Sequence, residues 1–258
     1  MNYDIKPILD SFPYEPGEVN ARIIKGLDGK EKLQMRLDLG LIQMELEGRP
    51  DGQRPHGYES LLDYYEAKAE QEGRECLELN SEECEALRAE GTQYYYRYLC
   101  CLQLGEFRRA ARDTARNLRL FDFMKKHAAS EEDKLALERY RPYVLMMNTK
   151  AEALMLATEG RIRAALSRID RGAKQIEEFY RAHGNEQLII LSVELMALNS
   201  LRKHLENAAI RAPAEVLEQK LQEAIEREDY ALAARIRDQL RELQKKLQEN
   251  RPAGEHEV

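Results

Sequence analysis

Hydrophobic and polar residues alternate one by one between about residues 21 and 47. The alternation runs in one phase from Leu33 to Leu39 and in the opposite phase after Gly40. Alternation is typical of half-buried strands, and a glycine at a change of phase indicates a bulge or a tight bend. Asp28-Gly29 adds a hairpin signal. We therefore predict a small antiparallel β-meander over residues 21–47, preceded by an irregular lead-in.

From Tyr58 onward the apolar residues follow the spacing of helices. We predict helices over about residues 60–72, 81–104, 106–126, 130–159, 161–182 and 186–208, with Pro142 as a kink or a break. The expected fold is mainly α. Its predicted parts are a β-meander with a Pro/Gly-rich loop (1–57), a helical array (58–210), a helical hairpin that begins at Pro213 (213–250), and a disordered tail (251–258).

Both arms of the predicted hairpin carry apolar residues every three or four positions, the spacing of a coiled-coil seam. These residues are Leu217, Leu221, Ala224 and Ile225 in the first arm, and Ala233, Ile236, Leu240, Leu243 and Leu247 in the second. Between the arms, Asp229 is placed to accept a backbone N–H as the N-cap of the second helix. A hairpin this short is not expected to bury its own seam, so another surface should cover it.

The hairpin resembles the UVR motif, also called the UvrB/UvrC motif. The resemblance rests on Leu217-xxx-Leu221-xx-Ala224 and on Asp229-Tyr230-xx-Ala233-Ala234-xx-Arg237-Asp238-x-Leu240-xx-Leu243, with Tyr230 where that family often has Phe. The motif occurs in excision-repair subunits B and C and in proteins of Clp-type unfoldase systems. There it is a protein-docking module and not a catalytic one.

The resemblance implies a docking surface and a choice of partners. The partner-binding residues it implies are Tyr230, Ala234, Ile236, Arg237, Asp238, Leu240 and Leu243. We expect Ile236, Leu240 and Leu243 to form the contact seam, with the charged and aromatic residues at its rim. The expected partner is an excision-repair subunit, a Clp-type unfoldase system or a second copy of the chain. The alternative is a plain hairpin that caps the helical array.

Two predicted joints between helices share one sequence pattern. Leu104-Gly105-Glu106-Phe107 and Glu159-Gly160-Arg161-Ile162 are each followed by an alanine three residues after the large hydrophobe. Glycine ends a helix in a left-handed turn, and alanine lets the next helix pack closely. The pattern resembles the turn of tetratricopeptide (TPR) helix pairs, which implies an array that binds peptides or proteins. The alternative is an ordinary antiparallel helical array.

Composition narrows the functional classes. Charged residues make up 34% of the chain and the net charge is −7, which argues against general coating of nucleic acid. The sequence has neither a signal peptide nor an apolar run of membrane-spanning length, so we expect the cytoplasm. Four cysteines (Cys76, Cys84, Cys100 and Cys101) form no CxxC pair, and we expect reduced thiols, no metal and no cofactor.

Two further groups of residues are candidate sites. Arg49, Arg54 and His56 lie in the loop Gly48–Gly57, where they could converge on an anion or ligand; the alternative is a rigid turn. Arginines also share one face of the helix over residues 106–126, and they are Arg108, Arg109, Arg112, Arg116 and Arg119. A similar set lies on residues 161–182, with Arg161, Arg163, Arg168, Arg171 and Lys174.

These Arg-rich faces could meet phosphates, or they could be solvated and paired with neighbouring carboxylates. No phosphate-binding, zinc-protease or nucleophile-elbow motif occurs in the sequence. The sequence therefore predicts a non-enzymatic interaction protein. The alternative is a nucleic-acid-binding protein that uses the Arg-rich faces of residues 106–126 and 161–182.

Overall fold

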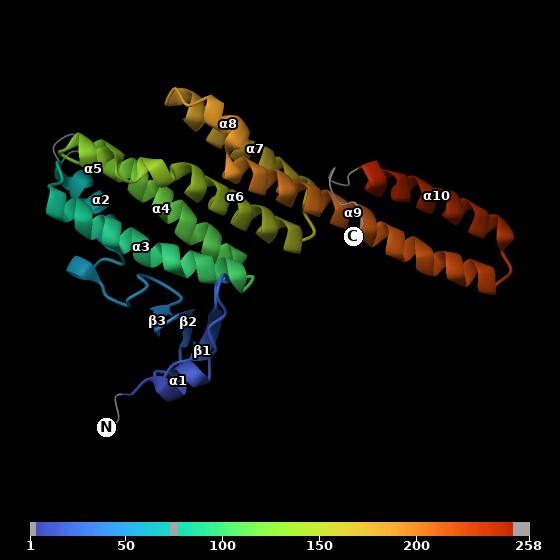
Figure 1. Ribbon diagram of the computed structural model, residues 1–258, viewed down its shortest axis with the longest axis horizontal. Helices are drawn as coiled ribbons and strands as arrows, with labels where there is room; N and C mark the ends of the chain where they lie inside the picture. The colour runs from blue at the N-terminus through green and yellow to red at the C-terminus, as the bar shows by residue number, and fades with distance from the viewer. Residues whose placement is uncertain (1–3, 73–76, 250–258) are drawn as a thin grey trace. The chain divides into compact units, whose positions relative to one another are not determined.

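A computed structural model describes residues 4–72 and 77–249 of the chain (Figure 1). The chain divides into two compact units, residues 1–155 and 156–258. The predicted fold class is confirmed: the described residues are mainly helical, with a three-stranded antiparallel sheet near the N-terminus and a helix pair near the C-terminus. The predicted tail 251–258 and Cys76 lie outside the described residues.

The elements of the first unit begin with a short helix and the sheet. They are α1 (Lys6–Asp10), β1 (Ala21–Lys25), β2 (Glu31–Leu37), β3 (Gly40–Glu45), η1 (Pro55–Gly57), α2 (Leu61–Glu72), α3 (Ser81–Gln103), α4 (Phe107–His127), α5 (Glu131–Leu135), η2 (Glu138–Tyr140) and α6 (Arg141–Thr158). The helix predicted over 130–159, with Pro142 as a kink or a break, is not continuous. It is broken between α5 and α6, and Pro142 lies in the first turn of α6, where proline is tolerated.

The sheet has the strand order β1-β2-β3, and one face packs on helices. Leu37 pairs with Gly40, so the predicted change of phase is a tight hairpin. Leu33 and Met44 belong to a hydrophobic cluster with residues of α3, α4 and α6, including Tyr98 and Cys101. This cluster attaches the sheet to the helices.

The other face of β2 is buried too, which corrects the prediction of a half-buried strand. Lys32, Gln34 and Arg36 are all buried. Gln34 accepts from Arg22 Nε at 2.8 Å and donates to Gln43 at 3.0 Å, so one polar ladder crosses all three strands. Arg36 donates to the Phe12 carbonyl at 2.9 Å. These polar positions predicted a face of β2 that is exposed to solvent. Their side chains instead form hydrogen bonds with neighbouring strands and with the chain before β1.

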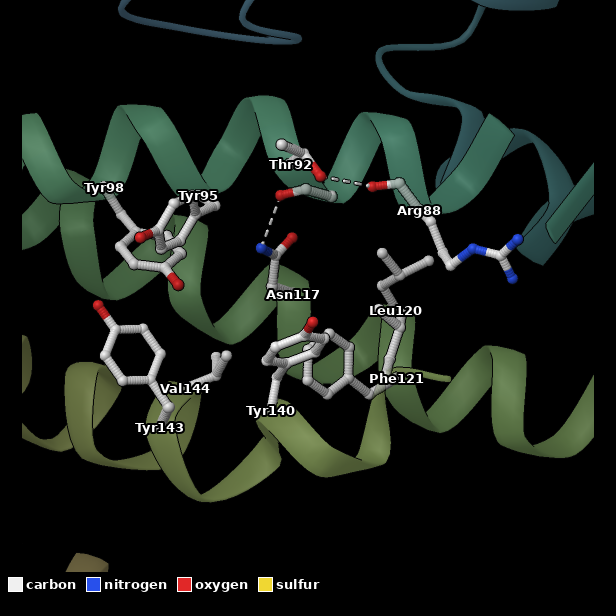
Figure 2. A pocket seen from close by; sticks show the side chains of 12 residues that line it. Arg88, Thr92, Tyr95, Tyr98, Asn117, Leu120, Phe121, Tyr140, Tyr143 and Val144 are labelled. Carbon is white, nitrogen blue, oxygen red and sulfur yellow. Dashed lines mark hydrogen bonds between the residues drawn. The ribbon is translucent and has the colours of Figure 1, made fainter. Parts of the chain in front are cut away.

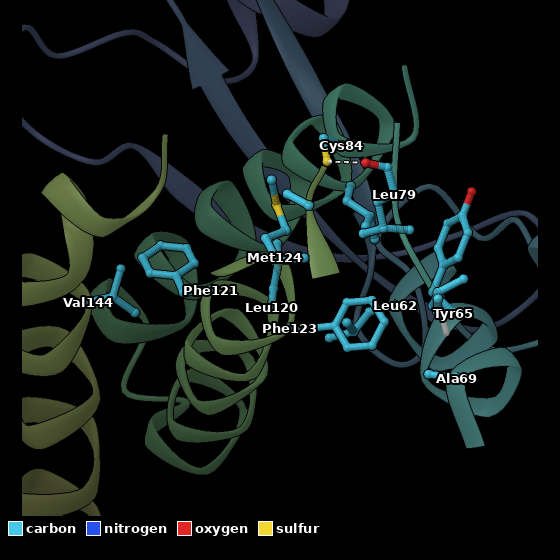
Figure 3. Close-up of a cluster of buried hydrophobic side chains, with 13 residues drawn as sticks. Leu62, Tyr65, Ala69, Leu79, Cys84, Leu120, Phe121, Phe123, Met124 and Val144 are labelled. Carbon is cyan, nitrogen blue, oxygen red and sulfur yellow. Dashed lines mark hydrogen bonds between the residues drawn. The ribbon is translucent and has the colours of Figure 1, made fainter. Parts of the chain in front are cut away.

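A second hydrophobic cluster lies between α2, α3 and α4 (Figure 3). Leu62 of α2, Leu87 of α3 and Leu120 of α4 are fully buried in it. Leu79 bonds to the end of α4, donating to the His127 carbonyl at 2.7 Å. This bridge fixes the segment before α3 against the end of α4.

Buried charges connect α3 and α4. Arg97 and Asp113 are fully buried and form a bidentate pair, with N···O distances of 2.6 and 2.9 Å. Arg97 also donates to the carbonyls of Glu45 and Gly48, at 3.0 and 2.8 Å. Because a buried charge must be paired, this contact ties the end of β3 to both helices.

Glu90 forms the second buried ion pair between these helices. It accepts from Arg116, and it also accepts the backbone N–H groups of Leu61 and Leu62, at 2.7 and 3.2 Å. Those N–H groups open α2, so a carboxylate of α3 caps the N-terminus of α2. A negative charge there also complements the helix dipole.

The second unit contains α7 (Ile162–Ala182), α8 (Gln187–Leu191), α9 (Val193–Glu226) and α10 (Tyr230–Glu249). Ile169 and Ile176 of α7 and Leu198 of α9 are buried, and these two helices pack together. No helix in the described part of the chain is long and apolar enough to cross a membrane.

Two predicted boundaries in this unit are wrong. Ser192 interrupts the predicted helix 186–208, because its hydroxyl caps α9 by accepting the Leu195 N–H at 3.2 Å. The predicted helix also does not end near residue 208, because α9 continues through Pro213. The first arm of the hairpin is therefore the second half of a 34-residue helix.

The predicted glycine joints are confirmed. Gly105 and Gly160 have φ values of +77° and +74°, and each ends a helix in the left-handed conformation. At both joints the next residue donates its N–H back into the helix, to Cys101 and Leu156 respectively, at 2.8 and 2.9 Å. These paired bonds form Schellman motifs.

We predict that Asp113→Asn destabilises the first unit by about 3 kcal/mol or more, because it leaves the buried Arg97 charge without its carboxylate. Glu131→Gln, which removes a partner of Lys134 from an exposed ion pair, is the matched control and should change stability by less than about 1 kcal/mol. Urea unfolding followed by circular dichroism measures both. Equal midpoints for the two variants would contradict the assignment.

The buried thiols should be unreactive. Burial raises the pKa of Cys84 to about 11 and of Cys100 and Cys101 to about 12, so these thiols stay protonated at pH 8. In a Cys76→Ser variant, we predict almost no reaction with Ellman's reagent until denaturant is added, and three thiols per chain afterwards. Rapid labelling of the folded variant would show that the helices open readily.

Candidate functional site

The turn between α9 and α10 is closed by hydrogen bonds at both helix ends. Asp229 accepts the Leu232 N–H at 3.0 Å through its carboxylate, which confirms the predicted N-cap of α10. Its own N–H donates to the Ala224 carbonyl at 2.9 Å, and the Glu228 N–H donates to Ile225 at 3.0 Å. These two bonds complete a Schellman motif at the end of α9.

Glu228 occupies the left-handed position of this motif, with φ of +57°. The corresponding positions at the ends of α3 and α6 are glycines. A side chain at positive φ costs free energy, roughly 1 kcal/mol relative to glycine. The hairpin turn therefore keeps a glutamate in a conformation that favours glycine.

The apolar seam of the hairpin is buried between its own two arms. Ile236 and Leu240 are only 5% and 6% exposed. They form a cluster with buried alanines and half-buried leucines of both arms: Ala214, Leu217, Leu221, Ala224, Ala233 and Leu243. The expectation that the hairpin cannot cover its own seam is wrong. Small residues such as Ala224 and Ala233 let α9 and α10 pack closely enough to fill it.

One seam residue was assigned to the wrong face. Ile225 is 47% exposed, because the helix ends at the next residue and its side chain lies outside the interface. The side chain of Leu247 lies outside those that the structure describes. The described seam therefore ends at Leu243.

The seven predicted partner-binding residues fall into two sets. Ile236, Leu240 and Leu243 pack in the seam with α9; a partner can reach Ile236 and Leu240 only if the hairpin opens, and Leu243 is half-buried. The exposed residues are Tyr230, Ala234, Arg237 and Asp238, which are spaced four, three and one apart along α10 and so share its outer face. We call these four residues the outer stripe.

Sequence reasoning predicted Tyr230 as a partner-binding residue but missed Leu232 and the exposure of Ile225 beside the turn. Leu232 is 45% exposed and Tyr230 is 69% exposed, and Ile225 is exposed at the end of the other arm. These three are large apolar or aromatic side chains within eight residues of sequence, all open to water. The signal was available, since a polar turn would ordinarily carry none of them. Together with the outer stripe they form the candidate site.

The predicted basic face of α4 is not an exposed cationic surface. Arg116 is only 8% exposed and is paired with Glu90. Its neighbours are paired with carboxylates of other elements: Arg109 and Arg112 with Glu47, and Arg119 with Asp63 and Glu66. Arg108 has an interaction partner as well. The alternative in which carboxylates pair with this face is the one the contacts support.

The arginines of α7 are partly neutralised in the same way. Arg161 lies 3.2 Å from Glu159, and Lys174 lies 3.7 Å from Glu178. Arg168 is buried. A continuous exposed stripe of positive charge is therefore interrupted along this helix too.

The loop Gly48–Gly57 holds its three candidate residues in different surroundings. Arg49 lies 3.2 Å from Asp51 and 3.5 Å from the buried Glu90, so two carboxylates neutralise its charge. The His56 ring stacks on Tyr64 at a centroid distance of 4.0 Å. Arg54 is exposed. These contacts favour an architectural turn, and an anion site in this loop remains a prediction.

Comparison with known proteins identifies the hairpin. The family model of the UvrB/uvrC motif (UVR) matches residues 213–246, which confirms the predicted resemblance for α9 and α10. No family model matches the rest of the chain, so the TPR likeness remains a prediction. The chain matches no curated protein and no solved structure.

The turn gives a matched pair of tests. We predict that Asp229→Ala destabilises the hairpin by about 1 kcal/mol, because the Leu232 N–H loses its acceptor. Glu228→Gly should instead stabilise the hairpin or leave it unchanged, because glycine adopts the positive φ without cost. Amide hydrogen exchange of residues 214–243, measured by mass spectrometry, reports both changes. Faster exchange in Glu228→Gly would show that the glutamate side chain contributes a stabilising contact.

Proposed function

We propose that this protein is a non-enzymatic adaptor that binds another protein through the outer surface of its C-terminal hairpin. The observation that carries the proposal is the match of residues 213–246 to the UVR motif, on a hairpin whose turn exposes apolar side chains. A motif of this kind generally supports protein–protein interaction. The hairpin's own seam is filled, so the contact is assigned to its outside.

The outer surface suits a specific and moderate-sized contact. Tyr230 and Arg237 are both exposed, and tyrosine and arginine are among the residues that dominate binding energy at interfaces. Asp238 places a negative charge beside Arg237, and a fixed pair of opposite charges selects a partner with the complementary arrangement. Ile225 and Leu232 supply the apolar centre that such a contact needs.

Three partners fit the resemblance. They are an excision-repair subunit, a component of a Clp-type unfoldase system, and a second copy of this chain. The proposal places the contact in the cytoplasm. In support, Cys84, Cys100 and Cys101 are free thiols, which suits a reducing compartment.

The test is a nuclease-treated pull-down from the source cell's lysate. Full-length protein is compared with a Tyr230→Ala, Arg237→Glu double variant, in which both changes are on exposed side chains and leave the seam intact. We predict that one partner is lost or depleted at least tenfold by the double variant. The identity of that partner distinguishes repair from proteolysis, and light scattering of the same variant tests self-association.

Two controls complete the design. Arg171→Glu reverses an exposed charge on α7, away from the hairpin, and should retain the partner. Leu240→Asp places a charge in the buried seam, so it should unfold the hairpin and lose the partner as well. Identical partners from the wild type, the double variant and Leu240→Asp would mean that the hairpin is structural only.

A further inference from the structure

A cavity of about 510 Å³ opens between α3, α4 and the chain from Leu137 through η2 to the first turn of α6, entirely within the first unit. Figure 2 shows Tyr95 and Tyr98 of α3 on one side, facing Tyr143 of α6 across the space. Leu120 and Phe121 of α4 form the inner wall. Cavities that bind small molecules commonly have volumes of about 300–1,000 Å³.

Five of the twelve residues that line this cavity are aromatic, four of them tyrosines, and we call it the tyrosine pocket. Tyr95 and Tyr98 meet edge to face at a centroid distance of 5.5 Å, and Tyr95 and Tyr143 lie 6.4 Å apart. Tyr140 lies at the rim. Rings at fixed angles present flat faces and edges, which attract the flat face or edge of another ring.

The polar groups of the pocket are few, and several are already engaged. Asn117 donates to the Gly91 carbonyl at 3.0 Å, and Thr92 donates to the Arg88 carbonyl at 3.1 Å. Burial raises the pKa of Tyr143 to about 12, so its hydroxyl stays protonated at neutral pH. Tyr143 also forms a side-chain hydrogen bond with Tyr95, and a tyrosine hydroxyl can donate one hydrogen bond while accepting another.

Charge in the pocket is nearly balanced. Arg88 is the one charged residue among those that line it in the described part of the chain, and it is paired with Asp133 at 2.5 Å. With no carboxylate in the lining, a cation would find no counter-ion there. The Arg88–Asp133 pair similarly gives an anion little net attraction. The chemistry of the walls fits an uncharged ligand.

We propose that the tyrosine pocket is a binding site for an uncharged, flat aromatic small molecule that carries a hydroxyl or similar hydrogen-bonding group. The ring system lies against Tyr95, Tyr140 and Tyr143, which keep exposed surface, whereas Tyr98 and Phe121 are almost fully buried. Its polar group bonds to a tyrosine hydroxyl. This site is independent of the hairpin, because every lining residue belongs to residues 88–144.

A protein segment is the competing occupant. An apolar side chain of a bound peptide would fill part of the same space, but the contact would then extend beyond the pocket to polar groups that take up its backbone bonds. At the pocket, the polar groups of Asn117 and Thr92 already bond within the protein. This favours a compact ligand over a peptide.

The probe is 1-naphthol, and its binding to the full chain is measured by isothermal titration calorimetry and saturation-transfer NMR. We expect saturable binding of one molecule per chain, and binding at least tenfold weaker for cyclohexylmethanol, which lacks a ring face. Thr92→Trp places an indole at the exposed mouth of the pocket and should weaken 1-naphthol binding at least tenfold. Tyr140→Ala removes a ring from the rim and should weaken it severalfold.

The matched control is Ala89→Trp, which adds the same side chain to an exposed position of α3 outside the pocket. It should bind 1-naphthol like the wild type. Circular dichroism confirms that each variant is folded. The proposal is overturned by non-saturable binding, by equal affinity in Thr92→Trp and wild type, or by an inert pocket whose Thr92→Trp variant instead loses a protein partner.

Discussion

Two buried ion pairs between α3 and α4 hold the first unit together. Arg97 with Asp113, and Arg116 with Glu90, place four charges in the interior, where each needs an opposite charge, although Arg116 Nε has no hydrogen-bond partner among the described residues. Arg97 also donates hydrogen bonds to carbonyls at the end of β3. Glu90 also accepts hydrogen bonds from the N–H groups that open α2. Because these hydrogen-bond partners belong to separate elements, the bonds to the buried charges also position the sheet and α2 on the helix pair.

The same constraint explains why the Arg-rich helix could be found in the sequence but not interpreted. Helical periodicity correctly placed the arginines of α4 on one face. Their acceptors lie far away in the chain: Glu90 is 26 residues from Arg116, and Glu47 is 65 residues from Arg112. Nothing local in the sequence indicates that separation. A face that appears ready for phosphates is instead saturated by carboxylates of α3, α2 and the segment after β3.

The sequence correctly predicted the helix ends that depend on hydrogen bonds within one turn of the chain. Glycine in a left-handed position ended α3 and α6 as expected, and Asp229 capped α10. The prediction was wrong where the cost of a proline in a helix competes with the packing of that helix. Pro213 predicted a helix boundary, yet α9 continues through it. Proline costs a helix one hydrogen bond and causes a steric clash, about 3 kcal/mol. Packing of α9 on both sides of Pro213 opposes that cost, since Leu198 and Leu205 are buried before it and Ala214 is buried after it.

The filled seam changes which residues of the hairpin can carry specificity. A hairpin with an open seam would bind through leucines, and leucines discriminate poorly between partners. With Ile236 and Leu240 already buried, the outer surface of the hairpin instead presents the Tyr230 ring, exposed aliphatic side chains at the turn, and the charges of Arg237 and Asp238. In the proposed contact, recognition therefore depends on the geometry and charge of the outer stripe, whereas the fold of the hairpin depends on the buried seam.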